Sequence, residues 1–129
     1  MSRQTIAAPA GAPPAGHYSP AVRAGDFVFV SGQGPLDPRT GEVVPGTVAE
    51  QTALTLRNLA AVAGAAGGSL ADVVKINAYL ADIGDFAEFN TAYAAATPAP
   101  PPARTTVATG LAGILVEIDA VLYLPGEGP

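Results

Sequence analysis

Hydrophobic residues follow the short-period patterns of β-strands in several stretches of the chain. A short hairpin is predicted where residues 21–24 and 27–31 flank the turn dipeptide Gly25–Asp26. Residues 27–30 are a continuous apolar run, which is typical of a strand covered on both faces. Residues 72–80 alternate and predict a third strand, one face of which is expected to carry Val74, Ile76, Ala78 and Leu80, and the other Val73, Lys75, Asn77 and Tyr79.

Two further strands are predicted near the C-terminus. They cover residues 104–109 and 114–124, and a tight glycine-containing turn at 110–113 joins them. The last strand alternates most clearly, so one of its faces can pack against helices. The opposite face carries a mixture of polar and apolar residues, namely Leu115, Glu117, Asp119, Val121 and Tyr123.

Two helices are predicted between these strands. Thr47 and Glu50 form the T-x-x-E signal of a capping box, and the helix that they open should end near Gly67–Gly68. Asp85 and Glu88 give a second such signal, before a helix whose apolar stripe is Phe86, Phe89, Tyr93 and Ala96. This helix must stop before Pro98, because the segment 97–103 (TPAPPPA) favours a stiff, extended connection.

The order of elements predicts an α+β fold: a mixed β-sheet with two helices packed on one face, in a single domain over residues 1–129. Residues 7–20 are rich in proline and small residues and should form an irregular lead that positions Tyr18. If both helices cover one face, the half-polar face is free to meet water or another subunit. The apolar run at 27–30 favours the subunit, so we expect a homo-oligomer.

Composition narrows the possible functions. Six basic residues against eleven acidic ones give a net charge of −5, which makes nucleic-acid binding a poor expectation. The chain has no cysteine and one histidine, His17, so a thiolate zinc site, a cysteine nucleophile or a histidine-rich metal site is excluded. No apolar run is long enough to span a membrane and the N-terminus lacks a signal-type segment, so we expect a cytoplasmic protein without a membrane partner.

Two charged residues are the main candidates for chemistry. Arg104 begins a strand directly after the proline-rich connection, and its planar guanidinium could hold a carboxylate through two hydrogen bonds or simply lie on the surface. Glu117 lies in mid-strand, where burial could raise its pKa for proton transfer, or where it could form an ion pair with Arg104 or Lys75. Tyr18 and Ser31 each offer a hydroxyl group.

Several segments resemble the Rid (YjgF-type) reactive-intermediate deaminases. The N-terminal similarity covers residues 17–21 (HYSPA), 25–33 (GDFVFVSGQ) and 36–43 (LDPRTGEV). The middle and C-terminal similarities cover residues 72–75 (DVVK), 85–90 (DFAEFN), 102–107 (PARTTV) and 116–120 (VEIDA). These segments follow one another in the family's order over nearly the whole chain. The resemblance implies a chorismate-mutase-like fold and a homotrimer with three clefts between neighbouring subunits.

The resemblance also implies a reaction. Rid deaminases hydrolyse enamines and imines such as 2-aminoacrylate to 2-keto acids and ammonia, without a metal or organic cofactor. By motif, Arg104 would hold the substrate carboxylate, and Glu117 would activate water and transfer protons. Tyr18 and Ser31 would line the pocket, Asn90 would support it from outside, and the backbone of Thr106 would contact the substrate.

Three features depart from the family pattern. Thr106 replaces a common cysteine, His17 replaces a proline, and the turn before Glu117 is about two residues shorter, so Asp119 is the alternative to Glu117. Three other functions remain open beside the deaminase. They are a trimeric module that binds a small carboxylate without turnover, an enzyme for a larger enamine, and a ribonuclease, which the acidic charge and the single histidine disfavour.

Overall fold

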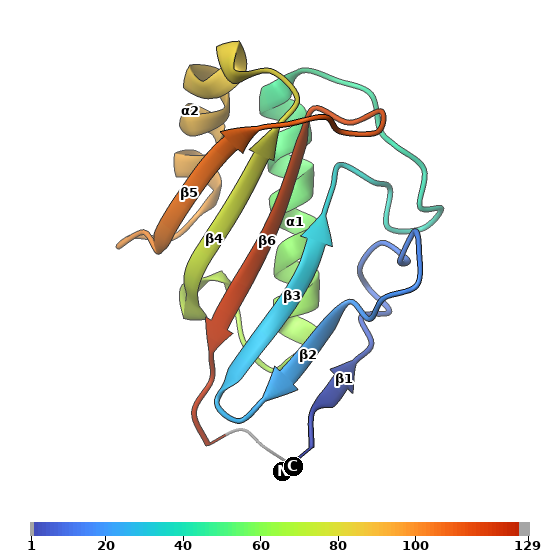
Figure 1. The fold of residues 1–129 in the computed structure, drawn as a ribbon, viewed down its shortest axis with the longest axis vertical. Coiled ribbons are helices and arrows are strands. Elements are labelled where there is room, and N and C mark those ends of the chain that lie inside the picture. Colours follow the sequence, from blue (N-terminus) through green and yellow to red (C-terminus); the bar gives the residue numbers. More distant parts are fainter. Residues whose placement is uncertain (1, 127–129) are drawn as a thin grey trace.

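The computed structural model describes residues 2–126, and its centre is one six-stranded sheet. The elements in chain order are β1 (Gln4–Ile6), β2 (Ala21–Ala24), β3 (Phe27–Gln33), α1 (Val48–Ala65), β4 (Val73–Leu80), α2 (Phe86–Ala96), β5 (Ala103–Ala108) and β6 (Val116–Tyr123). Short 3-10 helices, Leu70–Asp72 and Ile83–Asp85, precede β4 and α2. The strand order is β1-β2-β3-β6-β4-β5, and both helices lie behind the sheet in Figure 1. The α+β class and the placement of both helices on one face agree with the sequence prediction.

Helix α1 begins as its capping signal predicts. The Thr47 hydroxyl accepts a hydrogen bond from the Glu50 amide at 3.1 Å, and the Glu50 carboxylate accepts one from the Thr47 amide at 2.8 Å. These two bonds satisfy amide donors that the first helical turn leaves free. The helix buries Leu56, Leu59 and Val62 against the sheet.

Helix α2 begins at the predicted place, but the predicted capping box is wrong. Asp85 makes no capping bond with its side chain, and Asp82 instead accepts a hydrogen bond from the Gly84 amide in the preceding 3-10 turn. Glu88 accepts a hydrogen bond from the Ala49 amide at 3.0 Å, so its carboxylate satisfies a donor at the start of α1. Glu88 therefore links α2 to the start of α1 and does not cap its own helix.

A β-bulge changes the expected faces of β4. Val73 pairs with Leu122 and Lys75 pairs with Val121 on β6, which leaves Val74 as the extra residue. Val73 is consequently buried and Val74 is 43% exposed, the reverse of the strict alternation predicted from the sequence. After the bulge the predicted pattern returns, and Ile76 faces the helices.

Strands β5 and β6 are consecutive in sequence but do not pair with each other. Strand β5 lies at the edge of the sheet, parallel to β4, and β6 runs antiparallel to β4 on its other side. The connection at residues 109–115 therefore crosses the end of β4, and the simple tight turn that we predicted is wrong. The predicted hairpin of β2 and β3 is confirmed, with Gly25 at φ 61°, a conformation suited to glycine. Strand β1, which adds to β2, was not predicted.

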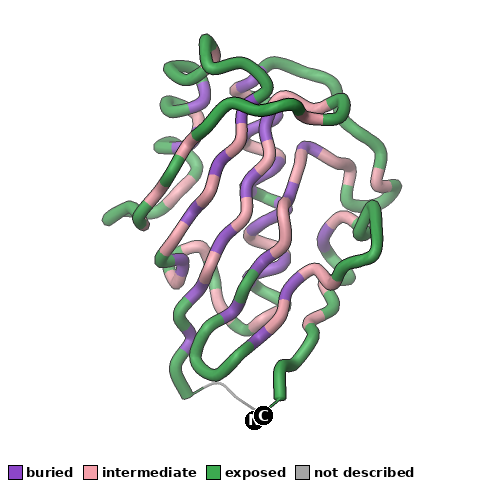
Figure 2. Tube along the Cα trace, viewed as in Figure 1, coloured by how far each residue is buried: buried purple, intermediate pink, exposed green. Residues whose placement is uncertain are grey.

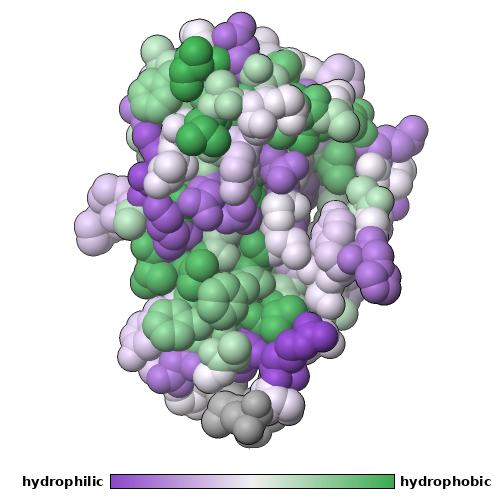
Figure 3. Space-filling view, in the orientation of Figure 1, coloured by the Kyte–Doolittle hydropathy of each residue, from purple (hydrophilic) through white to green (hydrophobic). Residues whose placement is uncertain are grey.

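One face of the sheet is buried under the two helices, and the other face, called the open face below, is not covered by them. Burial alternates along the central strands in Figure 2, and the buried positions of β6, such as Ile118 and Leu122, face α1 and α2. Figure 3 looks onto the open face, where a hydrophobic region in the lower part meets a hydrophilic band across the middle. Phe27, Phe29 and Tyr123 are 42%, 49% and 45% exposed, and the rings of Phe27 and Tyr123 lie 5.4 Å apart. Within residues 2–126, no helix is both long and apolar enough to cross a membrane.

Candidate functional site

Arg104 lies on edge strand β5 and faces the helices. It is paired with Ile76 of β4, a buried residue on the helix side of the sheet. Its guanidinium carbon lies 4.8 Å from the centre of the Tyr93 ring, 5.5 Å from that of Phe89 and 5.7 Å from that of Phe86. Cation–π contacts with three rings of α2 hold the long side chain in place. The ion pair formed within residues 2–126 is that of Arg39 with Asp37, so the Arg104 charge has no acidic partner there.

A pocket of about 440 Å³ opens beside Arg104. Asn90 and Tyr93 contribute from α2, and the proline-rich connection before β5 forms the remaining wall. The other lining residues are Ala94, Thr97, Pro98, Ala99, Pro101 and Pro102. The structure therefore places Asn90 and Arg104 together at a mostly apolar hollow.

Thr106 lies two residues after Arg104 and faces the same side of the sheet, because it is paired with the buried Ala78. Its hydroxyl is buried and finds no hydrogen-bond partner among residues 2–126. Because β5 is an edge strand, backbone groups on its outer side have no neighbouring strand to bond. Backbone contacts to a ligand are therefore possible along this edge.

Glu117 lies on the opposite face of the sheet. It is paired with Tyr79 of β4, between the buried residues Val116 and Ile118, so its side chain points away from the helices. Burial, and secondly the charge of Asp119, raise the pKa of the Glu117 carboxyl above its ordinary value. The expected alternatives of an ion pair with Arg104 or Lys75 are wrong, since Lys75 donates a hydrogen bond to the Thr105 hydroxyl at 2.8 Å.

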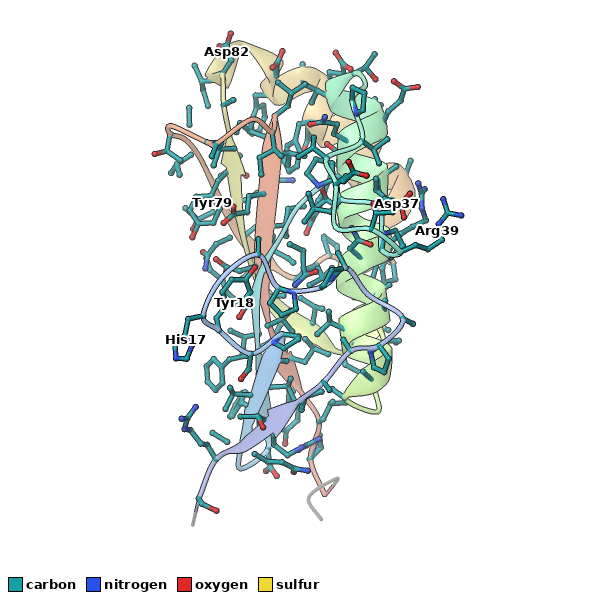
Figure 4. The ribbon with its side chains drawn as sticks, turned by 90° about the vertical axis from the view of Figure 1, so that its right-hand side faces the viewer. His17, Tyr18, Asp37, Arg39, Tyr79 and Asp82 are labelled. Atoms are coloured by element: carbon teal, nitrogen blue, oxygen red, sulfur yellow. The ribbon has the colours of Figure 1, made fainter. Side chains whose placement is uncertain are left out.

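Asp119 is fully engaged by β4. One of its carboxylate oxygens accepts a hydrogen bond from the Asn77 amide at 2.8 Å, and the other accepts one from the Tyr79 hydroxyl at 3.0 Å. The bond to Asp119, followed by burial, raises the pKa of Tyr79. Figure 4 shows Tyr79 on the side of the sheet away from α1. Asp119 is thus poorly placed to replace Glu117 as the group that handles water.

Tyr18 and Ser31 come near Glu117 through Gly32. A β-bulge at residues 31–32 brings Gly32 against Glu117, so that a Cβ atom built at Gly32 would lie 2.5 Å from a carboxylate oxygen. The Ser31 hydroxyl donates to the Ser19 carbonyl at 2.7 Å, which ties the N-terminal lead to β3. Tyr18 lines a small hollow with Gly32, and its hydroxyl accepts a bond from the Ala15 amide. Figure 4 shows His17 and Tyr18 on the lead, beside the open face.

The candidate residues therefore form two groups in one chain. Tyr18, Ser31 and Glu117 gather around Gly32 on the open face, whereas Arg104 and Asn90 lie at the edge of the sheet on the helix side. Among residues 2–126, no three metal-binding side chains come together.

Sequence reasoning missed two contributors to these groups. Gly32 was not singled out, because its close approach to Glu117 depends on the pairing of β3 with β6. The aromatic residues of α2 were read as a core stripe. Of these, Phe86 remains 40% exposed and supports Arg104. No local pattern in the sequence distinguishes a ring that packs in a core from one that supports an arginine.

Comparison with known proteins gives consistent matches over most of the chain. The family model described as endoribonuclease L-PSP matches residues 7–124. A RutC family protein of Pyrococcus horikoshii is 45% identical over 112 residues, which are 85% of this chain and 89% of that protein. The crystal structure of RidA from an Antarctic Psychrobacter is 41% identical, with a TM-score of 0.89 over 94% of this chain and 99% of that one. Escherichia coli TdcF with bound serine is 33% identical, with a TM-score of 0.85 over 93% and 98%.

Proposed function

Since the chain belongs to the endoribonuclease L-PSP family, also called the YjgF/RutC or Rid family, we propose that it hydrolyses enamines and imines derived from amino acids. The substrates would be of the 2-aminoacrylate type, and the products a 2-keto acid and ammonia. The observation that carries this proposal is the Arg104 guanidinium, which is held over three aromatic rings beside a pocket and has no acidic partner within residues 2–126. Such a group suits a planar carboxylate.

Glu117 supplies the proton chemistry in this proposal. Burial, and secondly the charge of Asp119, raise its pKa above the ordinary value, which favours a carboxyl group that both gives and takes protons. A proton added to the terminal carbon of 2-aminoacrylate gives a 2-iminium acid. Water then adds to the iminium carbon, the carbon–nitrogen bond breaks, and pyruvate and ammonia leave. Orientation by Arg104 and proton transfer by Glu117 are sufficient for this sequence, and it requires no cofactor.

The complete site would need two copies of the chain. Arg104 and Glu117 project from opposite faces of one sheet, so one chain cannot bring both to a single small substrate. We propose that β5 of one copy lies near Gly32 and Glu117 of the next, in a homotrimer with three such clefts. The exposed apolar residues on the open face, including Phe27, Phe29 and Tyr123, would be covered in this assembly. Tyr18, Ser31, Asn90 and the Thr106 backbone would line the cleft.

A larger enamine or imine is a second candidate substrate. The pocket has a volume of about 440 Å³, which is large beside 2-aminoacrylate with its six non-hydrogen atoms. Its walls of alanine and proline would suit an apolar side chain. The Arg104 guanidinium at the same pocket would hold the carboxylate in either case.

The direct test measures pyruvate formation from 2-aminoacrylate, which a pyridoxal-phosphate lyase generates from serine. We expect the protein to accelerate the reaction and Arg104→Ala to lower kcat/KM on the order of 10²-fold, because charge-assisted hydrogen bonds are lost. The matched control is Arg57→Ala, which removes an exposed arginine from α1. An unchanged rate with the wild-type protein would contradict the deaminase.

The same preparation separates the other functions. If pyruvate or serine binds in an Arg104-dependent way without turnover, the protein is a carboxylate-binding module. If single-stranded RNA is cut while the imine is not, the ribonuclease implied by the family's description is correct. The net charge of −5 and the position of His17 on the exposed lead favour neither nucleic-acid binding nor cleavage. Cytoplasmic location stays a prediction, to be tested by fractionation.

A further inference from the structure

The two acidic side chains of β6 on the open face have different surroundings. Asp119 receives two hydrogen bonds, from the Asn77 amide and the Tyr79 hydroxyl, one on each carboxylate oxygen. Tyr79 stands directly opposite Glu117 in the strand register, yet its hydroxyl bonds Asp119. Because both of its oxygens are bonded, the polar groups of β4 hold the Asp119 carboxylate in place on the face that it shares with Glu117.

The surroundings of Glu117 differ from those of Asp119. It is half-buried between Gly32 and β4, and the nearest acid on its own strand is Asp119, two residues away on the same face. Burial and a neighbouring negative charge both favour the neutral form of a carboxyl group. One of the two adjacent carboxyl groups is therefore bonded on both oxygens and the other is half-buried, and such unlike surroundings commonly divide the acid and base roles of an active site.

We propose that Asp119 is a positioning residue whose charge favours the protonated form of Glu117, so that Glu117 enters the reaction as the proton donor. This inference rests on the proposed function and gives it an order of steps. Glu117 gives its proton to the terminal carbon of the enamine and becomes a carboxylate. That carboxylate then takes a proton from the water that adds to the iminium carbon. The acid is restored, and the hydroxyl proton of the resulting carbinolamine passes to its amino group as the carbon–nitrogen bond breaks, so that the 2-keto acid and ammonia leave.

Few other charges act on Glu117. Within residues 2–126, the titratable groups beside it on the open face are Asp119 on β6 and Tyr79 and Lys75 on β4, and Tyr18 on the lead lines a hollow with Gly32. Lys75 lies beyond Asp119, and its ammonium group is bonded to Thr105 on the far side of β4. In the proposed assembly Arg104 of a neighbouring copy also approaches, but the substrate carboxylate neutralises that charge when it binds.

The first experiment follows the Glu117 carboxyl carbon by ¹³C NMR as pH changes, with Glu117→Gln to assign the signal. We expect Asp119→Asn to move the titration of Glu117 to lower pH, and Asp119→Glu to restore part of the shift. Asp26→Asn, which removes an exposed acid from the β2–β3 turn, should leave it unchanged. This measurement requires no turnover, so it tests Asp119 even if imine hydrolysis is absent. An unchanged titration in a folded Asp119→Asn protein overturns the proposal.

The second experiment measures kcat/KM against pH with 2-aminoacrylate. If Glu117 acts first as an acid, the rate falls at high pH, and Asp119→Asn should move this alkaline limb to lower pH. A merely structural role for Asp119 would lower the rate equally at all pH values or lower the melting temperature, without moving the limb. That result would also overturn the proposal.

Discussion

Gly32 and Glu117 meet across neighbouring strands with no space for a side chain at position 32. A Cβ atom there would lie 2.5 Å from Oε2 of Glu117 and 3.0 Å from its carboxyl carbon. The bulge at residues 31–32 brings the backbone of β3 to this point. The glycine therefore determines where the Glu117 carboxyl group lies.

Gly32→Ala should separate activity from folding. The atom in the way is the end of a flexible side chain, so Glu117 can move aside and the melting temperature should change little. Moving a reacting group by about 1 Å can cost on the order of 10²-fold in rate, and we expect a loss of that size in kcat/KM. Gly110→Ala is the control, because a Cβ atom at Gly110 meets nothing within 4 Å. Full activity of Gly32→Ala would show that the position of Glu117 is not important.

Mixing two inactive variants should restore activity if the site is shared between copies. Arg104→Ala and Glu117→Gln should each be nearly inactive alone. In mixed cyclic trimers, about one quarter of the clefts receive an intact Arg104 from one chain and an intact Glu117 from its neighbour. We therefore expect up to about one quarter of wild-type activity per cleft after the two proteins are unfolded and refolded together. Absence of any recovery in well-formed mixed oligomers would contradict the shared cleft.

Filling the pocket beside Arg104 should affect large substrates more than small ones. Ala94 lines this pocket, whereas the neighbouring Ala95 is exposed and does not line it. With imines generated from amino acids by an oxidase, Ala94→Phe should lower kcat/KM for the leucine-derived imine by roughly fourfold for each methylene that it displaces. The alanine-derived imine should react at an unchanged rate, and Ala95→Phe should react like the wild type with both. Equal losses with both imines would mean that the pocket does not hold the substrate side chain.

The raised pKa of Glu117 predicts a pH-dependent stability. A carboxyl group with a higher pKa in the folded state binds more protons there than in the unfolded chain, so its stabilising contribution is present below its ordinary pKa of 4.5. That contribution is lost as pH rises through the folded-state pKa. Glu117→Gln should therefore gain melting temperature relative to the wild type as pH rises above 4.5. Glu42→Gln, which changes an acid in an exposed loop, is the control. If the melting temperatures of wild type and Glu117→Gln changed in parallel with pH, the pKa shift of Glu117 would be contradicted.

Local signals in the sequence were reliable where nearby residues determine the structure. The glycine turn at Gly25 and the capping box of Thr47 and Glu50 both form as predicted, because each depends on contacts within a few residues. The bulge at Val74 and the parallel pairing of β5 with β4 depend on strands far apart in sequence, and a period-two pattern carries no information about them.

The same distinction applies to the site. The residues 104–106 and 117–119 show which side chains share a face of their own strand. They do not show that β5 and β6 lie on opposite sides of β4, nor that Arg104 projects from one face of the sheet and Glu117 from the other. The local environment of each group, such as the three rings around Arg104, became visible only with the fold.

The sheet that separates Arg104 from Glu117 also ties chemistry to association. If the proposed cleft is shared between copies, a lone chain cannot bring both groups to one substrate, and turnover per chain should decline once the protein is diluted below the dissociation constant of its assembly. A substitution at a distant contact between copies would then abolish the reaction while both groups remain chemically intact. In the proposed assembly, the strength of self-association would itself be a kinetic parameter.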